Sequence, residues 1–269
     1  MVSAGAPPRS LPDVLRRIVA RRRECFGLAP AALGLDPPGE TTAPPLVASR
    51  FVAALAARRG NAVIAEVKMG SPRLGSLAGR VDALRQARLY AAHGAACLSV
   101  VVEPDFFFGS YELLAACREA SGLPAVAKDF VVDVRQLDEA RAAGADAVLL
   151  VAALYEATEL AELAAAARRR GLVPLVETHD AAEVARLAGR DWELVGVNNR
   201  DLRSFDVDLE RSIALAPTLP PGALRVAESG IATRTDVTRL AAAGFDAFLI
   251  GESLLLADDP AAKLAELLG

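Results

Sequence analysis

Eight short apolar segments, spread along most of the chain, constrain its fold more than any other feature of the sequence. Each is four to eight residues long and rich in Val, Ile, Leu and Ala. They begin at Val63, Ala96, Ala125, Ala147, Pro174, Leu194, Arg225 and Ala247. Continuous apolar runs of this length are typical of strands covered on both faces. The chain therefore favours a parallel sheet with helices packed on it.

A glycine stands a few residues before every segment, where a helical stretch ends. Stretches such as LRQARLYAAHG and VTRLAAAG have helical composition, and glycine ends helices because it adopts the left-handed conformation at no steric cost. The glycines are Gly60, Gly94, Gly122, Gly144, Gly171, Gly189, Gly222 and Gly244. Eight helix–glycine–strand units in about 200 residues predict an α/β fold, a single closed (β/α)8 barrel.

An open, doubly wound sheet is the alternative arrangement of the same units. That fold usually has an early glycine-rich phosphate turn, and neither G-x-G-x-x-G nor G-x-x-x-x-G-K-[ST] is present. The start of the chain differs from the rest, because prolines cluster there around LPDVLRRIVARRRECF, which has helical periodicity. We interpret residues 1–47 as a helical extension and linker that docks on the barrel, and residues 48–269 as the catalytic barrel.

The charge balance excludes a polymeric acidic partner. The chain has 30 basic and 34 acidic side chains, a net charge of -4, and its longest basic runs are three arginines. A nucleic-acid binder needs a wider basic footprint, whereas a small anionic substrate needs only a locally positive pocket. No uncharged apolar stretch reaches membrane-spanning length, and the first residues do not resemble a signal peptide. We expect a cytoplasmic protein, a monomer or weak homo-oligomer.

Charged residues end several of the apolar segments. In a (β/α)8 barrel the active site lies at the carboxyl ends of the strands. The residues are Glu66, Lys68, Lys128, Glu177 and Glu228. One such charge would simply face water, but five meeting at one mouth are costly to bury unless they are paired or used. Two lysines facing three carboxylates can provide an acid and a base.

The sequence gives no sign of a metal or a cofactor. Three cysteines without C-x-x-C spacing argue against a zinc site and a disulfide framework. The chain has two histidines, His93 and His179; we interpret His93 as a helix-capping residue, and expect His179 at the rim rather than in catalysis. Small-residue turns after the seventh and eighth segments, at Ser229-Gly230 and Gly251-Glu252, suit a phosphate group.

Several strings resemble one family. VIAEVKMGSPRLGSL resembles the signature of the indole-3-glycerol phosphate synthases, in which E-x-K is followed by a short stretch and S-P. KDF, NNRDL and ESGI match in the same order, over roughly residues 48–260. The resemblance implies ring closure of 1-(2-carboxyphenylamino)-1-deoxyribulose 5-phosphate with loss of CO2 and water, in tryptophan biosynthesis. It implies no cofactor and no metal.

The resemblance also implies roles for single residues. Lys128 resembles the general acid that protonates the substrate carbonyl, and Glu177 the base that assists the later dehydration. Lys68 resembles the lysine that holds the carboxylate or phosphate side and can donate a proton in dehydration. A neighbouring cation such as Lys68 is expected to lower the pKa of Lys128, which would suit an acid.

Further residues are implied to orient these groups or to bind substrate. Those expected to orient lysines or contact hydroxyl groups are Glu66, Asn198 and Glu228. Those at positive or phosphate-side positions are Ser71, Arg200, Ser229, Gly230, Gly251 and Glu252, the last through its backbone N–H. Those expected to form an apolar wall for the aromatic ring are Phe107, Phe130 and Leu150.

The chain departs from the family pattern just after its first lysine. The family usually has a basic residue and then A-S-P-S, whereas this chain has Met69-Gly70-Ser71-Pro72-Arg73. Arg73 replaces a small hydroxyl residue, which either adds a carboxylate or phosphate contact or marks a paralogue from a secondary pathway that acts on a substituted anthranilate. A catalytically silent barrel and another phosphosugar isomerase are the remaining alternatives.

Overall fold

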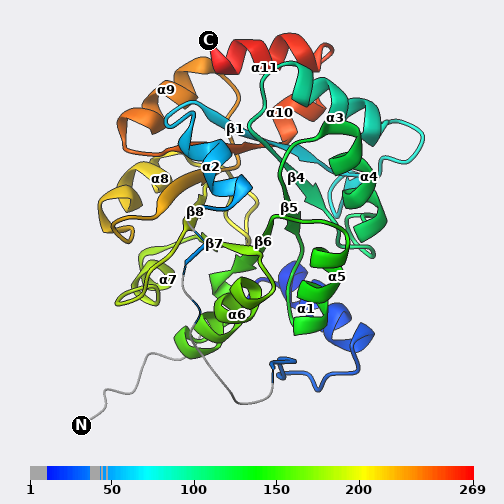
Figure 1. Ribbon diagram of the computed structural model, residues 1–269, viewed down its shortest axis with the longest axis vertical. Coiled ribbons are helices and arrows are strands. Elements are labelled where there is room, and N and C mark those ends of the chain that lie inside the picture. Colours follow the sequence, from blue (N-terminus) through cyan, green and yellow to red (C-terminus); the bar gives the residue numbers. More distant parts are fainter. Residues whose placement is uncertain (1–10, 37–42, 44, 47) are drawn as a thin grey trace.

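The computed structural model describes residues 11–36, 43, 45–46 and 48–269, and its centre is a closed barrel of eight parallel strands (Figure 1). The strands are β1 (Ala62–Val67), β4 (Cys97–Val101), β5 (Ala125–Lys128), β6 (Ala147–Val151), β7 (Val173–Thr178), β8 (Leu194–Asn198), β9 (Leu224–Glu228) and β10 (Ala247–Ile250). The barrel closes because β1 pairs in parallel with both β4 and β10. The predicted (β/α)8 barrel is thus confirmed, and the open sheet is excluded.

Helices alternate with these strands and surround them (Figure 1). They are α2 (Arg50–Ala56), α3 (Ala83–Ala92), α4 (Tyr111–Ser121), α5 (Val134–Ala142), α6 (Ala157–Arg169), α7 (Ala181–Ala185), α8 (Glu210–Leu215), α9 (Arg234–Ala242), α10 (Glu252–Leu255) and α11 (Pro260–Leu268). Every glycine predicted to end a helical stretch has a positive φ. Gly122, for example, ends α4 with φ +70° and donates its N–H to Arg118 O. His93 caps the end of α3, as predicted.

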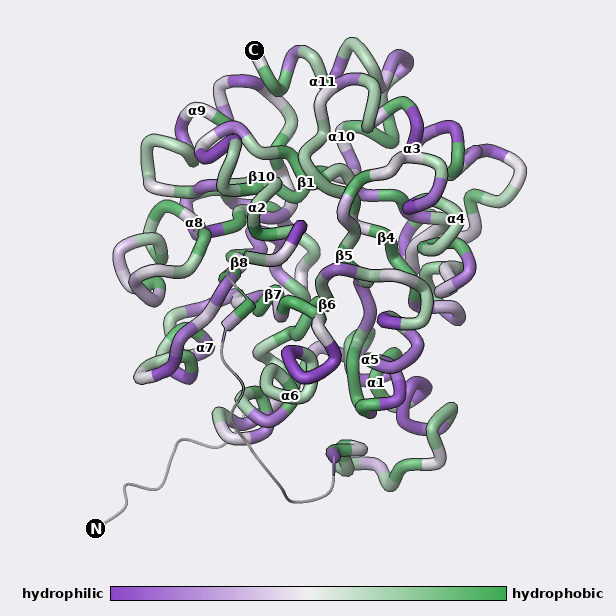
Figure 2. The backbone as a smooth tube through the Cα atoms, in the orientation of Figure 1, coloured by the Kyte–Doolittle hydropathy of each residue, from purple (hydrophilic) through white to green (hydrophobic). Residues whose placement is uncertain are grey.

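The buried side chains form two main layers, which follow the alternation of side chains along each strand. One layer fills the barrel and includes Ile64, Leu175 and Val226. The other lies between the strands and the helices. In Figure 2 the strands are largely coloured as hydrophobic, whereas hydrophilic segments alternate with hydrophobic ones along the helices. A residue's place in this alternation therefore decides whether it can reach the barrel's interior or mouth.

The extension helix α1 (Asp13–Cys25) packs on the barrel through the apolar stripe seen in the sequence. Leu15 and Val19 are buried in a separate cluster with Val132, which follows β5. Arg22 and Asp129 form a buried ion pair between α1 and the end of β5. Helix α1 is thus fixed beside the strand that ends at Lys128. The proline-rich segment 37–42 and residues 44 and 47 lie outside the described residues, and the division at residue 47 stays a prediction.

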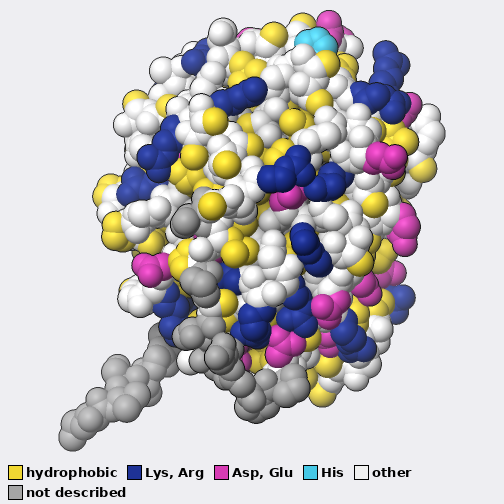
Figure 3. Space-filling view, viewed as in Figure 1, with side chains coloured by type: hydrophobic (Ala, Val, Ile, Leu, Met, Phe, Trp, Pro, Cys, Tyr) yellow, Lys and Arg dark blue, Asp and Glu magenta, His cyan; other side chains and the backbone are white. Residues whose placement is uncertain are grey.

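Charges of both signs are interspersed on the face shown in Figure 3, with no continuous basic surface. Within the described ranges, no helix is long and apolar enough to cross a membrane. Short antiparallel strands β2 (Gly70–Ser71) and β3 (Gly75–Ser76) form a hairpin in the loop after β1. This hairpin carries the segment that departs from the family pattern.

Candidate active site

A cavity of about 660 Å³ opens at the carboxyl ends of the barrel strands. Its size is that of ordinary small-molecule sites. All the predicted site residues except Leu150 line it, and Val14, Leu15 and Ile18 of α1 also contribute. The sequence did not reveal the contribution of α1, because its apolar stripe reads only as a surface that must be buried. The cavity is where the chemistry of this chain must be sought.

The alternation along the strands explains why the charged residues converge. Ile64, Val126, Leu175 and Val226 fill the barrel interior. Side chains two residues further along a strand lie on the same face, one layer nearer the mouth. These are Glu66, Lys128, Glu177 and Glu228, and all four line the cavity. Five strands contribute polar groups in this way, since Asn198 ends β8 in the same layer.

The same alternation corrects one predicted residue. Leu150 is fully buried between the barrel and the surrounding helices, so its assignment to the apolar wall is wrong. Its neighbours Leu149 and Val151 point into the barrel and line the cavity. An error of one position reverses the face, because the side-chain period of a strand is two. Phe107 and Phe130 do form an apolar wall, with ring centroids 6.1 Å apart.

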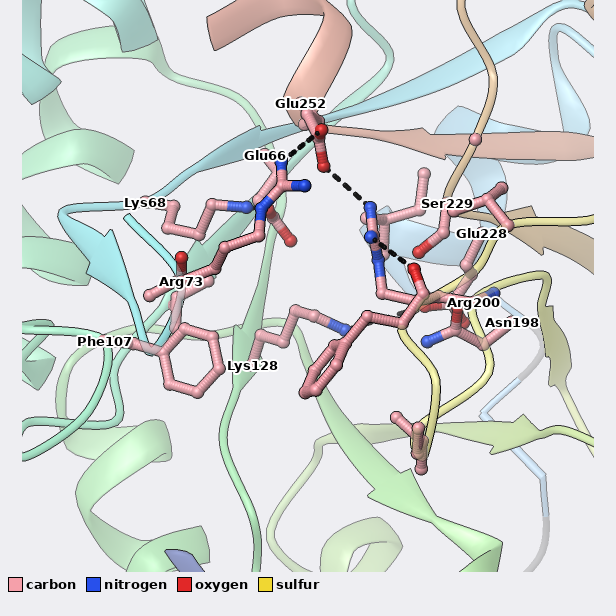
Figure 4. Close-up of a pocket in the computed structure, with 18 of the residues that line it drawn as sticks. Glu66, Lys68, Arg73, Phe107, Lys128, Asn198, Arg200, Glu228, Ser229 and Glu252 are labelled. Atoms are coloured by element: carbon pink, nitrogen blue, oxygen red, sulfur yellow. Dashed lines mark hydrogen bonds and ion pairs between the residues drawn. The ribbon is translucent and has the colours of Figure 1, made fainter. Parts of the chain in front are cut away.

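Both lysines lie inside the cavity, where Figure 4 shows them with Glu66 and Glu228, and each is paired with carboxylates. Lys128 Nζ lies 3.3 Å from Glu177 Oε2 and 3.6 Å from Glu228 Oε2. Lys68 Nζ lies 2.8 Å from Glu66 Oε1. Lys68 thus pairs with Glu66, whereas Lys128 pairs with the other two carboxylates, Glu177 and Glu228. The predicted combination of two amines and three carboxylates is thus assembled in one cavity.

The pKa of Lys128 is raised, not lowered as the sequence led us to expect. Burial favours the neutral amine, but the carboxylates of Glu177, Glu228 and Glu66 outweigh it. The expectation failed because Lys68 is neutralised locally by Glu66, whereas Lys128 has two carboxylates within contact distance. Lys128 therefore carries its proton at neutral pH, as an acid must.

The two carboxyl groups beside Lys128 are shifted in opposite directions. Burial raises the pKa of both, but the positive charges of Lys128 and His179 reverse the effect for Glu177, whose pKa is lowered. Burial and the negative charge of Glu177 raise the pKa of Glu228. Neighbouring titratable groups with divergent pKa values mark acid and base assignments. Glu177 is therefore the member that is ionised at neutral pH.

Two glycines make room for these carboxylates. A Cβ on Gly196 of β8 would overlap Glu228 Oε1, and a Cβ on Gly251 would overlap Glu66 Oε1. Sequence reasoning missed Gly196, although a glycine inside an apolar strand signals close approach by another group. Gly251 was expected at the phosphate site, and the structure gives it this additional role beside Glu66.

The turns after β9 and β10 form the other end of the cavity. Ser229 has φ +68°, a conformation that a residue with a side chain adopts only when its surroundings hold it. Asn199 holds it by donating its side-chain amide to the carbonyl oxygens of Ser229 and Glu228. Backbone donors of the Ser229-Gly230 and Gly251-Glu252 turns thus border the cavity where phosphate is expected.

Two arginines meet at Glu252, as Figure 4 shows. Arg73 Nη2 lies 2.8 Å from Glu252 Oε1, and Arg200 Nη2 lies 2.7 Å from Glu252 Oε2. The Glu252 carboxylate therefore binds both arginines, in addition to the backbone N–H that the sequence led us to expect as a phosphate donor. Arg73, which departs from the family pattern, reaches across the cavity mouth from the β2–β3 hairpin.

His179 does not lie at the rim. Its side chain is 10% exposed and contacts Glu177 and Glu183. His179 follows β7 directly, on the side of the strand that Glu177 occupies. The rim position expected for it was wrong because Glu183 of helix α7 packs against the ring and covers it.

Comparison with known proteins identifies the family. The family model described as indole-3-glycerol phosphate synthase matches residues 15–267. The chain belongs to the indole-3-glycerol phosphate synthase family. The indole-3-glycerol phosphate synthase of Albidiferax ferrireducens is 43% identical over 258 residues, which cover 95% of this chain and 98% of the relative. That of Koribacter versatilis is 46% identical over 213 residues, covering 79% of this chain and 82% of the relative.

The match to the indole-3-glycerol phosphate synthase family begins inside α1 and runs through the whole barrel. A solved structure of thiamine phosphate pyrophosphorylase from Pyrococcus furiosus shares the fold, with a TM-score of 0.58, 16% identity, and coverage of 78% of this chain and 95% of that chain. At this identity the likeness concerns the barrel alone. The family assignment instead rests on sequence and includes the extension helix.

Proposed function

We propose that this protein is an indole-3-glycerol phosphate synthase that acts in tryptophan biosynthesis. Its reaction is the ring closure of 1-(2-carboxyphenylamino)-1-deoxyribulose 5-phosphate with loss of CO2 and water. The observation that carries the proposal is the position of Lys128, between Glu177 and Glu228 in the cavity that also holds Lys68. Family membership supports it, since the relatives bear this name over nearly their whole length.

Ring closure needs an acid at the substrate carbonyl. A carbonyl is a weak electrophile until it is protonated, and Lys128 is the protonated amine at the centre of the cavity. The aromatic carbon that bears the carboxylate attacks the carbonyl carbon, and the carbonyl oxygen takes the proton of Lys128. Loss of CO2 from that aromatic carbon then restores aromaticity.

Dehydration needs a base and a second proton donor. Glu177 is ionised, and it accepts the proton that leaves as the double bond of the indole forms. Lys68, held by Glu66, assists the departure of the hydroxyl as water. Glu228 and Asn198 border the same space and contact the substrate hydroxyl groups. Every step uses side chains of this chain, and the proposal includes no cofactor.

The two ends of the cavity suit the two ends of the substrate. Phe107 and Phe130 offer an apolar surface for the aromatic ring. The Ser229-Gly230 and Gly251-Glu252 turns, with Arg200 beside them, offer donors and positive charge for the phosphate. Ser71, in strand β2 of the hairpin, also lines the cavity. We further propose that the protein acts in the cytoplasm as a monomer or weak homo-oligomer.

The test is an assay of indole fluorescence with purified protein and the unsubstituted substrate. We expect a time-dependent indole signal together with release of one CO2 per product. Product of the same mass as the substrate would instead indicate an isomerase. Binding of substrate without CO2 release would indicate a catalytically silent barrel.

Arg73 is expected to affect substrate affinity rather than turnover. Its side chain is 61% exposed, lines the mouth of the cavity and pairs with Glu252, so Arg73→Ser should raise KM about 3- to 10-fold and change kcat less than about twofold. Steady-state kinetics with plain and ring-substituted substrates check this. Arg80→Ser, also exposed, is the control. A preference of the wild type for a substituted anthranilate, lost in Arg73→Ser, would identify a secondary-pathway paralogue.

A further inference from the structure

His179, whose side chain is 10% exposed, is a titratable group for which the proposed reaction has no role. It follows β7 directly, two residues beyond Glu177. Its Nε2 atom lies 3.2 Å from Glu177 Oε1, whereas Lys128 lies against the other oxygen, Oε2. The two oxygens of the base are therefore held by two different cations, one on each side.

A second carboxylate holds the far side of the imidazole ring. Glu183 Oε2 lies 3.1 Å from His179 Nδ1 and also accepts the backbone N–H of His179 at 2.8 Å. The backbone N–H of Glu183 is itself bonded to Asp180 Oδ1, the cap of helix α7. The ring is thus held through its Nδ1 atom by Glu183, while its Nε2 atom faces Glu177 at ion-pair distance without a hydrogen bond.

Both ring nitrogens face carboxylates, an arrangement that favours the doubly protonated ring. Burial alone lowers the pKa of the imidazole, but Glu177 and Glu183 outweigh it and raise the pKa of His179 to about 10. The ring is therefore an imidazolium at neutral pH. A carboxylate–imidazolium–carboxylate row runs from the cavity to the start of α7, with Glu177 at its inner end.

We propose that His179, held by Glu183, is a positioning residue that fixes the Glu177 carboxylate and keeps it ionised for dehydration. The proposal rests on the proposed function, since it assumes that Glu177 is the base. Fixing one oxygen with His179 leaves the orientation of Glu177 unchanged when the substrate separates Lys128 from the other oxygen. A base that is held in its reactive orientation speeds the step, because no conformational entropy is lost when it must act.

The expected pH dependence follows from the charges around Glu177. Lys128 on β5 and His179 face it as cations; Glu228 on β9 and Glu66 on β1 face it as carboxyl groups. Removing one cation raises the pKa of Glu177, so the carboxylate forms only at higher pH. The acidic limb of the kcat profile should then move to higher pH by about one unit.

The kinetic test uses two replacements at one position. His179→Ala removes the contact and the charge, and should lower kcat about 10- to 100-fold with KM within about threefold. His179→Gln keeps an amide donor near Nε2 but no charge, so it should recover most of kcat at high pH and still show the shifted limb. His93→Gln, at the exposed cap of α3, is the matched control and should leave both unchanged.

A second variant keeps the proposal testable if the His179 variants do not fold. Glu183→Gln leaves His179 and Glu177 in place but removes the charge that faces Nδ1, and should shift the acidic limb in the same direction by a smaller amount. An unchanged limb in both His179→Gln and Glu183→Gln, with stable folded protein, would overturn the proposal. So would a loss of kcat in His179→Ala that His179→Gln does not partly recover.

A readout independent of turnover is the imidazole spectrum. The chain has two histidines, so His93→Gln leaves one set of ring signals for nitrogen-15 NMR. We expect both ring nitrogens of His179 to be protonated at pH 8, and Glu177→Gln to make the ring neutral at a lower pH than in its parent. A neutral ring at pH 8 in the parent contradicts the proposal. Absence of indole product from the wild type contradicts the proposed function instead. The NMR spectrum then still tests whether His179 is protonated between Glu177 and Glu183.

Discussion

Lys128→Met is expected to abolish indole formation, with kcat reduced by about 10³-fold or more while substrate affinity stays within about tenfold. The reason is that Lys128 supplies the proton that makes the carbonyl electrophilic, an interaction that strengthens only as the transition state forms. Methionine has nearly the length of lysine and keeps the apolar stem, so the cavity retains its shape. Single-turnover kinetics and equilibrium binding of the substrate measure the two quantities separately.

The side effect of this substitution is predictable and can be controlled. Lys128 Nζ lies 3.3 Å from Glu177 and 3.6 Å from Glu228, so its removal would leave the two carboxyl groups without the cation between them, and Glu228, which has no other ion-pair partner described, would take up a proton. Lys263→Met, on α11 with its amine on Ala232 O and Glu266, removes a lysine outside the cavity and should leave kcat unchanged. Substantial turnover by Lys128→Met would refute Lys128 as the acid.

The fold and most of the site were predictable because two short-range rules apply throughout the chain. The left-handed glycines before the strands and the apolar strand segments define the repeated unit, and the (β/α)8 barrel follows. Parallel strands share one carboxyl edge, so Lys128, Glu177 and Glu228 had to meet once the barrel was assumed. The sequence contained both the residues and the edge on which they lie.

The errors occurred where the outcome depends on which groups touch. Leu150 was placed on the wrong face because an entirely apolar segment has no alternation from which to read its register. The direction of the Lys128 pKa shift depends on whether an amine or a carboxylate is nearer, and residues far apart in sequence decide that. The burial of His179 depends on the path of α7, which the residues before it do not specify.

The contacts at the mouth of the cavity also could not be predicted from the sequence. Arg73, Arg200 and Glu252 come from three separate loops, and no local pattern joins them. Sequence alone assigned Glu252 a backbone donor, since a carboxylate repels an anion. The structure adds that this carboxylate is occupied by two guanidinium groups, so that the end of the cavity expected to bind phosphate keeps a net positive charge.

Glu177→Gln is expected to lower kcat about 10²- to 10⁴-fold by stopping the reaction after CO2 has left. Glutamine keeps the shape of the side chain but cannot accept the proton that leaves during dehydration. Lys128 retains Glu228 as a partner and remains protonated, so ring closure and decarboxylation still proceed. A single turnover should release close to one equivalent of CO2 without an indole signal, whereas Lys128→Met should release none.

Comparing CO2 release by these two variants shows whether the acid, Lys128, acts before the base, Glu177. Glu210→Gln is the control for Glu177→Gln, because Glu210 pairs with Arg239 on the protein surface and its side chain is 63% exposed. If Glu177→Gln released no CO2, the carboxylate would be needed for ring closure and its assignment to dehydration would be wrong. If CO2 and indole appeared together at the wild-type rate, Glu177 would not be the base, and Glu228, the other carboxyl group beside Lys128, would be the next to test.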